Sequence, residues 1–208
     1  MRATVMHAFP VVVVALCGTA RAEVGEIRVG GGALAVFPAL SPSEATQMAS
    51  VGMGGRVALS LGTLHHRLRL LGRLSVWKHS GDLSEYRHAS AEATLSGNLR
   101  YHGEGYRGEL GIAWQAVGGY NLAPHLRAWV GYQWATFRDQ ALLAYGETFD
   151  APLPDRGEDS ATVGFGASLE QRIFNVVICG VSIDYTRAFS RLYRYDLSVS
   201  VTSSYYWF

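Results

Sequence analysis

The sequence predicts an all-β protein, a transmembrane antiparallel up-and-down β-barrel, and three observations favour this fold. Apolar residues alternate with small or polar ones over segments of about 10 to 15 residues, the length of a tilted strand that crosses a bilayer. No run of about 18 apolar residues follows Ala22, so no transmembrane helix is predicted. The 208 residues include one lysine, Lys78, whereas a soluble β-sandwich shows water a face rich in lysine and glutamate.

Residues 1–22 have the pattern of a secretory signal peptide. Arg2 precedes an apolar run that is too short to span a bilayer as a helix. The sequence Ala-Arg-Ala at residues 20–22 supplies a small-x-small cleavage site. We therefore expect cleavage after Ala22 and a single domain over residues 23–208.

Charge and cysteine content exclude several classes of protein. The net charge of +1 at pH 7 gives no reason to expect a nucleic-acid partner. Cleavage would remove Cys17 and leave Cys179 as the only cysteine, so neither an intrachain disulfide nor a CxxC metal site can form. We expect no metal and no cofactor.

Residues 125–138 illustrate the two-faced pattern of the expected strands. Leu126 and Val130 lie on one face, opposite Arg127 and Gln133 on the other. Nine segments show such alternation: 24–37, 51–62, 66–78, 89–101, 106–122, 125–138, 160–174, 177–187 and 193–207. A single-chain barrel with both termini on one side of the membrane needs an even number of strands. We favour eight strands, and ten are possible if residues 139–159 contain another.

The polar faces mix small residues with arginine and carboxylates, which suits a narrow lumen where side chains from opposite walls interlock. Because unpaired charges in such an interior are costly, we expect Arg–carboxylate pairs that plug the lumen. The excess of arginine leaves open a small passive pore for small solutes. The charges expected to point into the lumen are Arg56, Arg67, Arg69, Arg73, Glu92, Arg100, Arg107, Glu109, Arg127, Glu170, Arg172 and Asp184.

Two sequence features carry a resemblance to a known family. The chain ends on Tyr205-Tyr206-Trp207-Phe208, and residues 118–134, GGYNLAPHLRAWVGYQW, are read as a strand end, a tight turn and a returning strand. The chain resembles the small bacterial outer-membrane β-barrels that include the OmpA transmembrane domain, OmpX and OmpW. The resemblance implies integral insertion in the outer membrane, with Tyr206 and Phe208 as the signal that the barrel-assembly machinery reads.

The same resemblance implies an orientation and a set of partners. Short turns of such barrels face the periplasm and long loops face outward, so a periplasmic Phe208 places residues 139–159 outside the cell. The implied partners are outer-membrane lipid and lipopolysaccharide, and the barrel is expected to be a monomer. Counting back by twos from Phe208 reaches the face opposite Leu197 and Val201, which predicts a bulge near Ser203-Ser204.

A structural or surface-interaction role is the favoured function, with the passive pore as the alternative and a lipid A-modifying enzyme third. Lipid A deacylases place a His and a Ser two positions apart, and His88 and Ser90 have that spacing. A serine nucleophile needs an adjacent base, but the alternation turns Ser90 toward the lumen and away from lipid. The wider motif is not evident either, so we expect no enzyme. The acidic residues of 139–159 lack a regular ligand spacing, which favours a solvated loop over a calcium or magnesium site.

Overall fold

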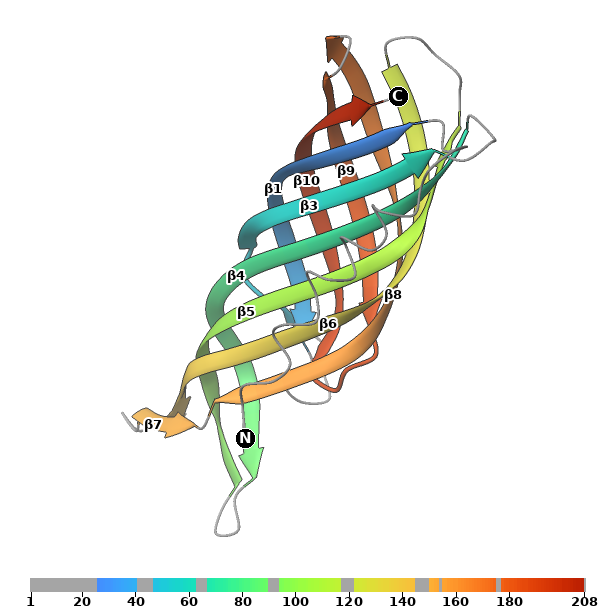
Figure 1. Ribbon diagram of the computed structural model, residues 1–208. Coiled ribbons are helices and arrows are strands. Elements are labelled where there is room, and N and C mark those ends of the chain that lie inside the picture. The colour runs from blue at the N-terminus through green and yellow to red at the C-terminus, as the bar shows by residue number, and fades with distance from the viewer. Residues whose placement is uncertain are drawn as a thin grey trace, which may run out of the picture.

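Eight long antiparallel strands form a closed barrel in the computed structural model, which describes residues 26–40, 47–62, 67–89, 94–116, 122–144, 150–153, 155–174 and 177–207 (Figure 1). The strands are β1 (Ile27–Leu40), β3 (Gly52–Gly62), β4 (Leu68–Ala89), β5 (Thr94–Gln115), β6 (Leu122–Ala144), β8 (Arg156–Phe174), β9 (Val177–Ala188) and β10 (Tyr193–Trp207). Each strand pairs with the next, and β10 also pairs with β1, which closes the sheet. The short β2 (Gln47–Met48) pairs with the end of β1, and β7 (Asp150–Leu153) pairs with β6.

Both ends of the strand array lie at one end of the barrel, where Ile27 pairs with Trp207. We call this the terminal end and the opposite one the distal end. At the distal end β4, β5 and β6, which are 22, 22 and 23 residues long, continue beyond the other strands (Figure 1). Helices long and apolar enough to cross a membrane are absent from the part of the chain that the structure describes.

The structure confirms eight strands and removes the odd count in the sequence prediction. Segments 89–101 and 106–122 are predicted as two strands, but they fall largely within one strand, β5. The possible tenth strand within 139–159 is the four-residue β7, which pairs only with the distal part of β6. Most of the described remainder of 139–159 extends β6 and β8, so the expected loop is shorter than predicted.

Two glycines explain why β5 does not read as one strand. Gly103 and Gly105 interrupt the alternation, and glycine ordinarily weakens a strand interior. In the barrel they lie beside large rings of β4. A Cβ on Gly103 would lie 2.4 Å from Nε2 of His79, and one on Gly105 would lie 2.2 Å from Cζ2 of Trp77. The glycines therefore make room for rings on the inner face.

The predicted bulge near Ser203-Ser204 is wrong. Both residues pair in unbroken register with β1 and with β9. Tyr205 is exposed on the same face as Val201, so the outer face of β10 continues through Tyr205 without interruption. The mismatch arose because the alternation was counted from Phe208. That residue and the predicted signal peptide lie outside the described residues.

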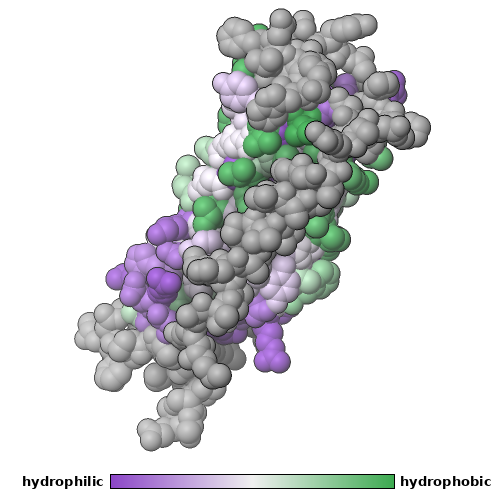
Figure 2. Space-filling model, viewed as in Figure 1, coloured by the Kyte–Doolittle hydropathy of each residue, from purple (hydrophilic) through white to green (hydrophobic). Residues whose placement is uncertain are grey.

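The central part of the barrel is apolar outside and polar inside. On the inner face, Arg56 and Glu109 are each 4% exposed. Aromatic side chains edge the outer wall on its distal side, where Tyr132 contacts Trp134 and Tyr185 contacts Tyr195. An apolar band with aromatic edges is typical of a wall that faces lipid, and Figure 2 shows hydrophobic residues along the middle and upper part of the visible outer wall. Outward apolar side chains that are more than half exposed include Val57, Leu110, Val130, Phe165, Ile183 and Val201.

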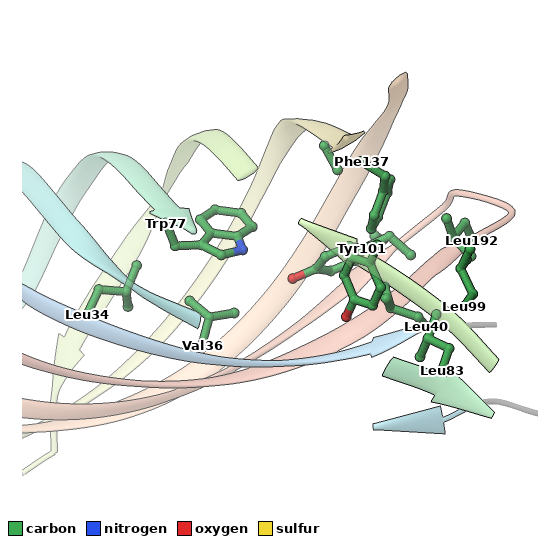
Figure 3. Close-up of a cluster of buried hydrophobic side chains, with 12 residues drawn as sticks. Leu34, Val36, Leu40, Trp77, Leu83, Leu99, Tyr101, Phe137 and Leu192 are labelled. Atoms are coloured by element: carbon green, nitrogen blue, oxygen red, sulfur yellow. The ribbon is translucent and has the colours of Figure 1, made fainter. Parts of the chain in front are cut away.

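Beyond this band the two faces exchange their chemistry while the alternation continues. Outward-facing Lys78, Asp82, Arg100 and His102 have side chains that are 77%, 57%, 59% and 63% exposed. The strands therefore pass from lipid into water, where an apolar interior and a polar exterior are usual. Inside, the distal half of the lumen holds an apolar cluster of Leu34, Val36, Leu40, Trp77, Leu83, Leu99, Tyr101, Ala135, Phe137, Ala188, Leu192 and Tyr193 (Figure 3).

The close packing of β5 against the rings of β4 is open to a direct test. Gly105→Ala should lower the free energy of unfolding by about 1 to 3 kcal/mol, because the new methyl group would overlap the Trp77 indole. Gly157→Ala is the matched control, since a Cβ there would have no atom within 4 Å. Urea unfolding in detergent micelles, followed by tryptophan fluorescence, measures both. Equal effects of the two substitutions would contradict the proposed packing.

Candidate functional site: the charged lumen

One buried carboxylate lies at the centre of the lumen and binds three arginines. Asp184 of β9 is 0% exposed. Its Oδ2 accepts hydrogen bonds from Nη1 of Arg56 at 2.6 Å and from Nη1 of Arg73 at 3.0 Å. Its Oδ1 accepts from Nη2 of Arg127 at 2.6 Å. The four residues lie on β9, β3, β4 and β6, so this carboxylate joins strands around the whole barrel.

The neighbouring strand leaves the space that this carboxylate fills. Gly166 of β8 pairs with Asp184, and a Cβ on Gly166 would lie 2.1 Å from Oδ1. Any larger side chain at this position would therefore displace the carboxylate from Arg127. The small residues on the polar faces are thus part of the charged site.

A second buried group surrounds Arg107 of β5, toward the distal end. Its guanidinium forms a two-point ion pair with Asp196 of β10, one contact of which, Nη1 to Oδ1, is 3.3 Å. Nε donates to Gln133 at 3.0 Å, and Nη1 donates to Thr186 at 3.1 Å. Tyr193 donates its hydroxyl to the same carboxylate at 3.3 Å. Every nitrogen of this guanidinium therefore has a partner, as a buried arginine requires.

Glu109 and two aromatic rings link these groups. Glu109 Oε2 lies 3.0 Å from Nε of Arg73, and its Oε1 lies 3.9 Å from Nη1 of Arg107. The Arg73 guanidinium lies 3.9 Å from the centroid of the Trp129 ring. The Arg107 guanidinium lies 4.8 Å from the centroid of the Trp77 ring. These cation–π contacts add to the ion pairs, because the ring faces attract the cations.

A third group of charges lies at the terminal end of the lumen. Arg28 of β1 bridges Glu26, at 2.7 Å, and Glu170 of β8, at 2.6 Å. Arg69 of β4 contacts the other oxygen of Glu26 at 2.8 Å. His125 Nδ1 lies 3.8 Å from Glu170. These side chains are 1% to 26% exposed, which makes this group the least buried of the three.

The structure assembles most of the charges that the sequence places in the lumen. Two are exposed instead. Arg67 lies in a turn before β4, and Arg100 pairs with Asp82 at 3.3 Å on the outer face. Arg100 points outward because its neighbours Leu99 and Tyr101 fill the apolar cluster, where the alternation was assigned the wrong way round. Glu92 and the side chain of Arg172 lie outside the described residues. The charges that contribute to the three groups are Arg56, Arg69, Arg73, Arg107, Glu109, Arg127, Glu170 and Asp184.

Sequence reasoning missed three members of the network. Glu26 and Arg28 belong to the glycine-rich first segment, whose place in the barrel was uncertain from the sequence. Asp196 shares the polar face of β10 with Ser198 and Ser200, so the alternation alone was enough to find it. Among the described side chains, no three His, Cys, Asp or Glu residues converge into a candidate metal site.

Comparison with solved structures identifies the fold class. Neisserial surface protein A superposes with a TM-score of 0.59 at 13% identity, over 87% of this chain and 98% of that one. OprG from Pseudomonas aeruginosa superposes with a TM-score of 0.56 at 13% identity, over 89% of this chain and 97% of that one. The attachment invasion locus protein Ail of Yersinia pestis superposes with a TM-score of 0.53 at 11% identity, over 89% of this chain and 100% of that one.

These comparisons show the fold alone, because the identities are low. No protein-family model and no curated protein sequence matches the chain. The chain has the fold of the small outer-membrane β-barrels with eight strands, as its alternation and its closing aromatic residues predict. Its outer wall is apolar, as a membrane-spanning barrel of this fold requires.

Removal of the central carboxylate should destabilise the barrel strongly. Asp184→Asn keeps the shape of the side chain but leaves Arg56, Arg73 and Arg127 without their shared charge. We expect a loss of about 3 to 5 kcal/mol in the free energy of unfolding. Asp82→Asn removes an exposed carboxylate from a surface ion pair and should cost less than about 1 kcal/mol. Urea unfolding in micelles compares the two, and similar losses would refute the central role of Asp184.

Proposed function

We propose that this protein has a structural or surface-interaction role in the outer membrane, with a barrel that serves as a closed scaffold. The observation that supports this role is the filling of the lumen. Arg–carboxylate pairs occupy the part from the terminal end to Arg107, and the apolar cluster occupies the distal half. A barrel of eight strands leaves an interior just wide enough for side chains. Solute passage would require both fillings to move.

The proposed orientation places the terminal end in the periplasm and the distal end outside the cell. The extensions of β4, β5 and β6 then project into the medium and present their polar outer face to partners. Assembly would proceed through β10, the strand that closes the barrel against β1. We propose a monomer, because closure leaves no unpaired barrel edge in the lipid.

Lipopolysaccharide is the partner that the surface chemistry favours. An open groove of about 400 Å³ lies on the outer wall just beyond the lipid-facing band, and its lining includes Lys78, His102 and Arg138 together with the carboxylates of Glu104 and Asp139. Lys78 is bonded to Glu104 at 2.9 Å but remains 77% exposed, and Arg138 is exposed. Cations at this height would meet the phosphates of the lipid headgroups.

Two other functions have weaker support. A passive pore would need a continuous path, and the apolar cluster of the distal half stands across it. A lipid A-modifying enzyme would rest on His88 and Ser90. His88 belongs to β4, but Ser90 and the side chain of His88 lie outside the described residues, so their geometry offers no support. The similarity to solved structures gives no support for an enzyme, because it concerns the fold alone.

The closed scaffold predicts electrical silence. Purified protein in planar lipid bilayers should give no resolvable conductance steps, because charged pairs and apolar side chains occupy the lumen. A porin inserted under the same conditions provides the positive control for insertion. Regular, anion-selective steps would instead establish the pore.

Mass spectrometry of lipid A from cells with and without the protein should show unchanged acylation, and a change would establish the enzyme.

The proposed headgroup contact predicts a specific loss of binding. Lys78→Gln with Arg138→Gln should weaken lipopolysaccharide binding to the protein in micelles by about thirtyfold, since each of the two charges near the surface contributes about 1 kcal/mol. Arg187→Gln with Arg191→Gln changes two exposed arginines on and next to β9, away from the groove, and is the control. Surface plasmon resonance against immobilised lipopolysaccharide measures both. Equal losses in the two variants would show only a general charge effect.

A further inference from the structure

The charges of the described lumen do not balance. Six arginines take part in the three groups: Arg28, Arg56, Arg69, Arg73, Arg107 and Arg127. Five carboxylates oppose them: Glu26, Glu109, Glu170, Asp184 and Asp196. Arg107 and Asp196 neutralise each other, so the excess positive charge falls on the terminal side. A buried charge without compensation is costly, so the excess needs an explanation.

The excess charge surrounds a cavity between the terminal group and the Asp184 group. Its volume is about 70 Å³. Five arginines line it, and Glu170 is its only carboxylate among the described residues. Its wall also includes Ser60 and Ser204, which lie near the terminal ends of β3 and β10. The cavity therefore has the charge of an anion site and lies on the terminal side of the filled lumen.

The arginines of this cavity have unused hydrogen-bond donors. Nε and Nη1 of Arg69, Nη2 of Arg73 and Nε of Arg127 are buried and have no hydrogen-bond partner. Arg69 is 8% exposed and Arg73 is 3% exposed, so bulk water does not solvate them freely. A buried guanidinium donor without a partner loses the hydrogen bonds that it would make in water. An anion in the cavity would offer acceptors to several of them after small side-chain rotations.

We propose that this cavity binds one small inorganic anion of the size of chloride or phosphate. The anion would balance the excess arginine charge and accept hydrogen bonds from both groups, joining the terminal group to the Asp184 group. The cavity has room for a small anion together with a few waters, since about 10 to 15 Å³ of such volume is enough for one water. The site differs from a pore because the anion would enter and leave from the terminal end only.

Anomalous diffraction tests the site in the native protein. Crystals grown from detergent and soaked in sodium bromide should show a bromide peak in the cavity, within hydrogen-bond reach of Arg69 or Arg127. Soaks in sodium phosphate, with bromide omitted, distinguish a phosphate site, which would show tetrahedral density there. A cavity that contains only water in both soaks would overturn the proposal.

Unfolding in solution tests whether the anion acts on the fold. At constant ionic strength, a bound anion at ten times its Kd should shift the folding equilibrium about tenfold relative to gluconate, an organic anion larger than chloride or phosphate. Sodium chloride and sodium phosphate are the two test salts. Arg69→Met should abolish the difference from gluconate, while Arg100→Met, which removes an exposed arginine, should preserve it. No difference among the three salts in the native chain, or one unchanged in Arg69→Met, would overturn the proposal.

Discussion

Closure of β10 on β1 is the constraint on which the rest of the structure depends. Within lipid, each unpaired backbone group costs several kcal/mol, so a sheet can cross the membrane only as a ring. Eight strands close around an interior that side chains must fill. The inward residues of opposite walls therefore meet, and their charges have to be paired where they meet. The three arginines on Asp184 follow from this narrow lumen.

The same strands meet two solvents, and the alternation serves both. In β5 the even-numbered residues form the outer face. Leu110 and Ile112 face lipid, and His102 and Glu104 lie on the same face nearer the distal end. The odd-numbered residues form the inner face, which changes from the charged Glu109 to the aromatic Tyr101 over the same distance. Between these points β5 stays in unbroken register with β4, and its register with β6 shifts only at the distal limit, between His102 and Arg100. The filling of the lumen changes along the same path, from ion pairs to an apolar cluster.

Filling so narrow a lumen depends on small residues as much as on large ones. Trp77 has space because Gly105 lies beside it, and the Asp184 carboxylate has space because Gly166 does. Both glycines look like weak points in a strand when only local preference is considered. Their value becomes clear only from the neighbouring strand. This explains why the prediction divided β5 around Gly103 and Gly105 and so counted nine segments.

The sequence by itself determined the alternating wall, the absence of long apolar runs and the arginine-rich polar faces, and these were enough for the barrel and its inward charges within the lipid-facing band. It assigned Arg100 to the wrong side because alternation does not say which face is the interior once a strand has left the lipid. Only the tertiary structure decided which carboxylate each arginine meets. Arg56 and Asp184 are 128 residues apart, and no local pattern encodes their contact. The physical reason is that ring closure and strand register set these contacts, and both depend on all eight strands together.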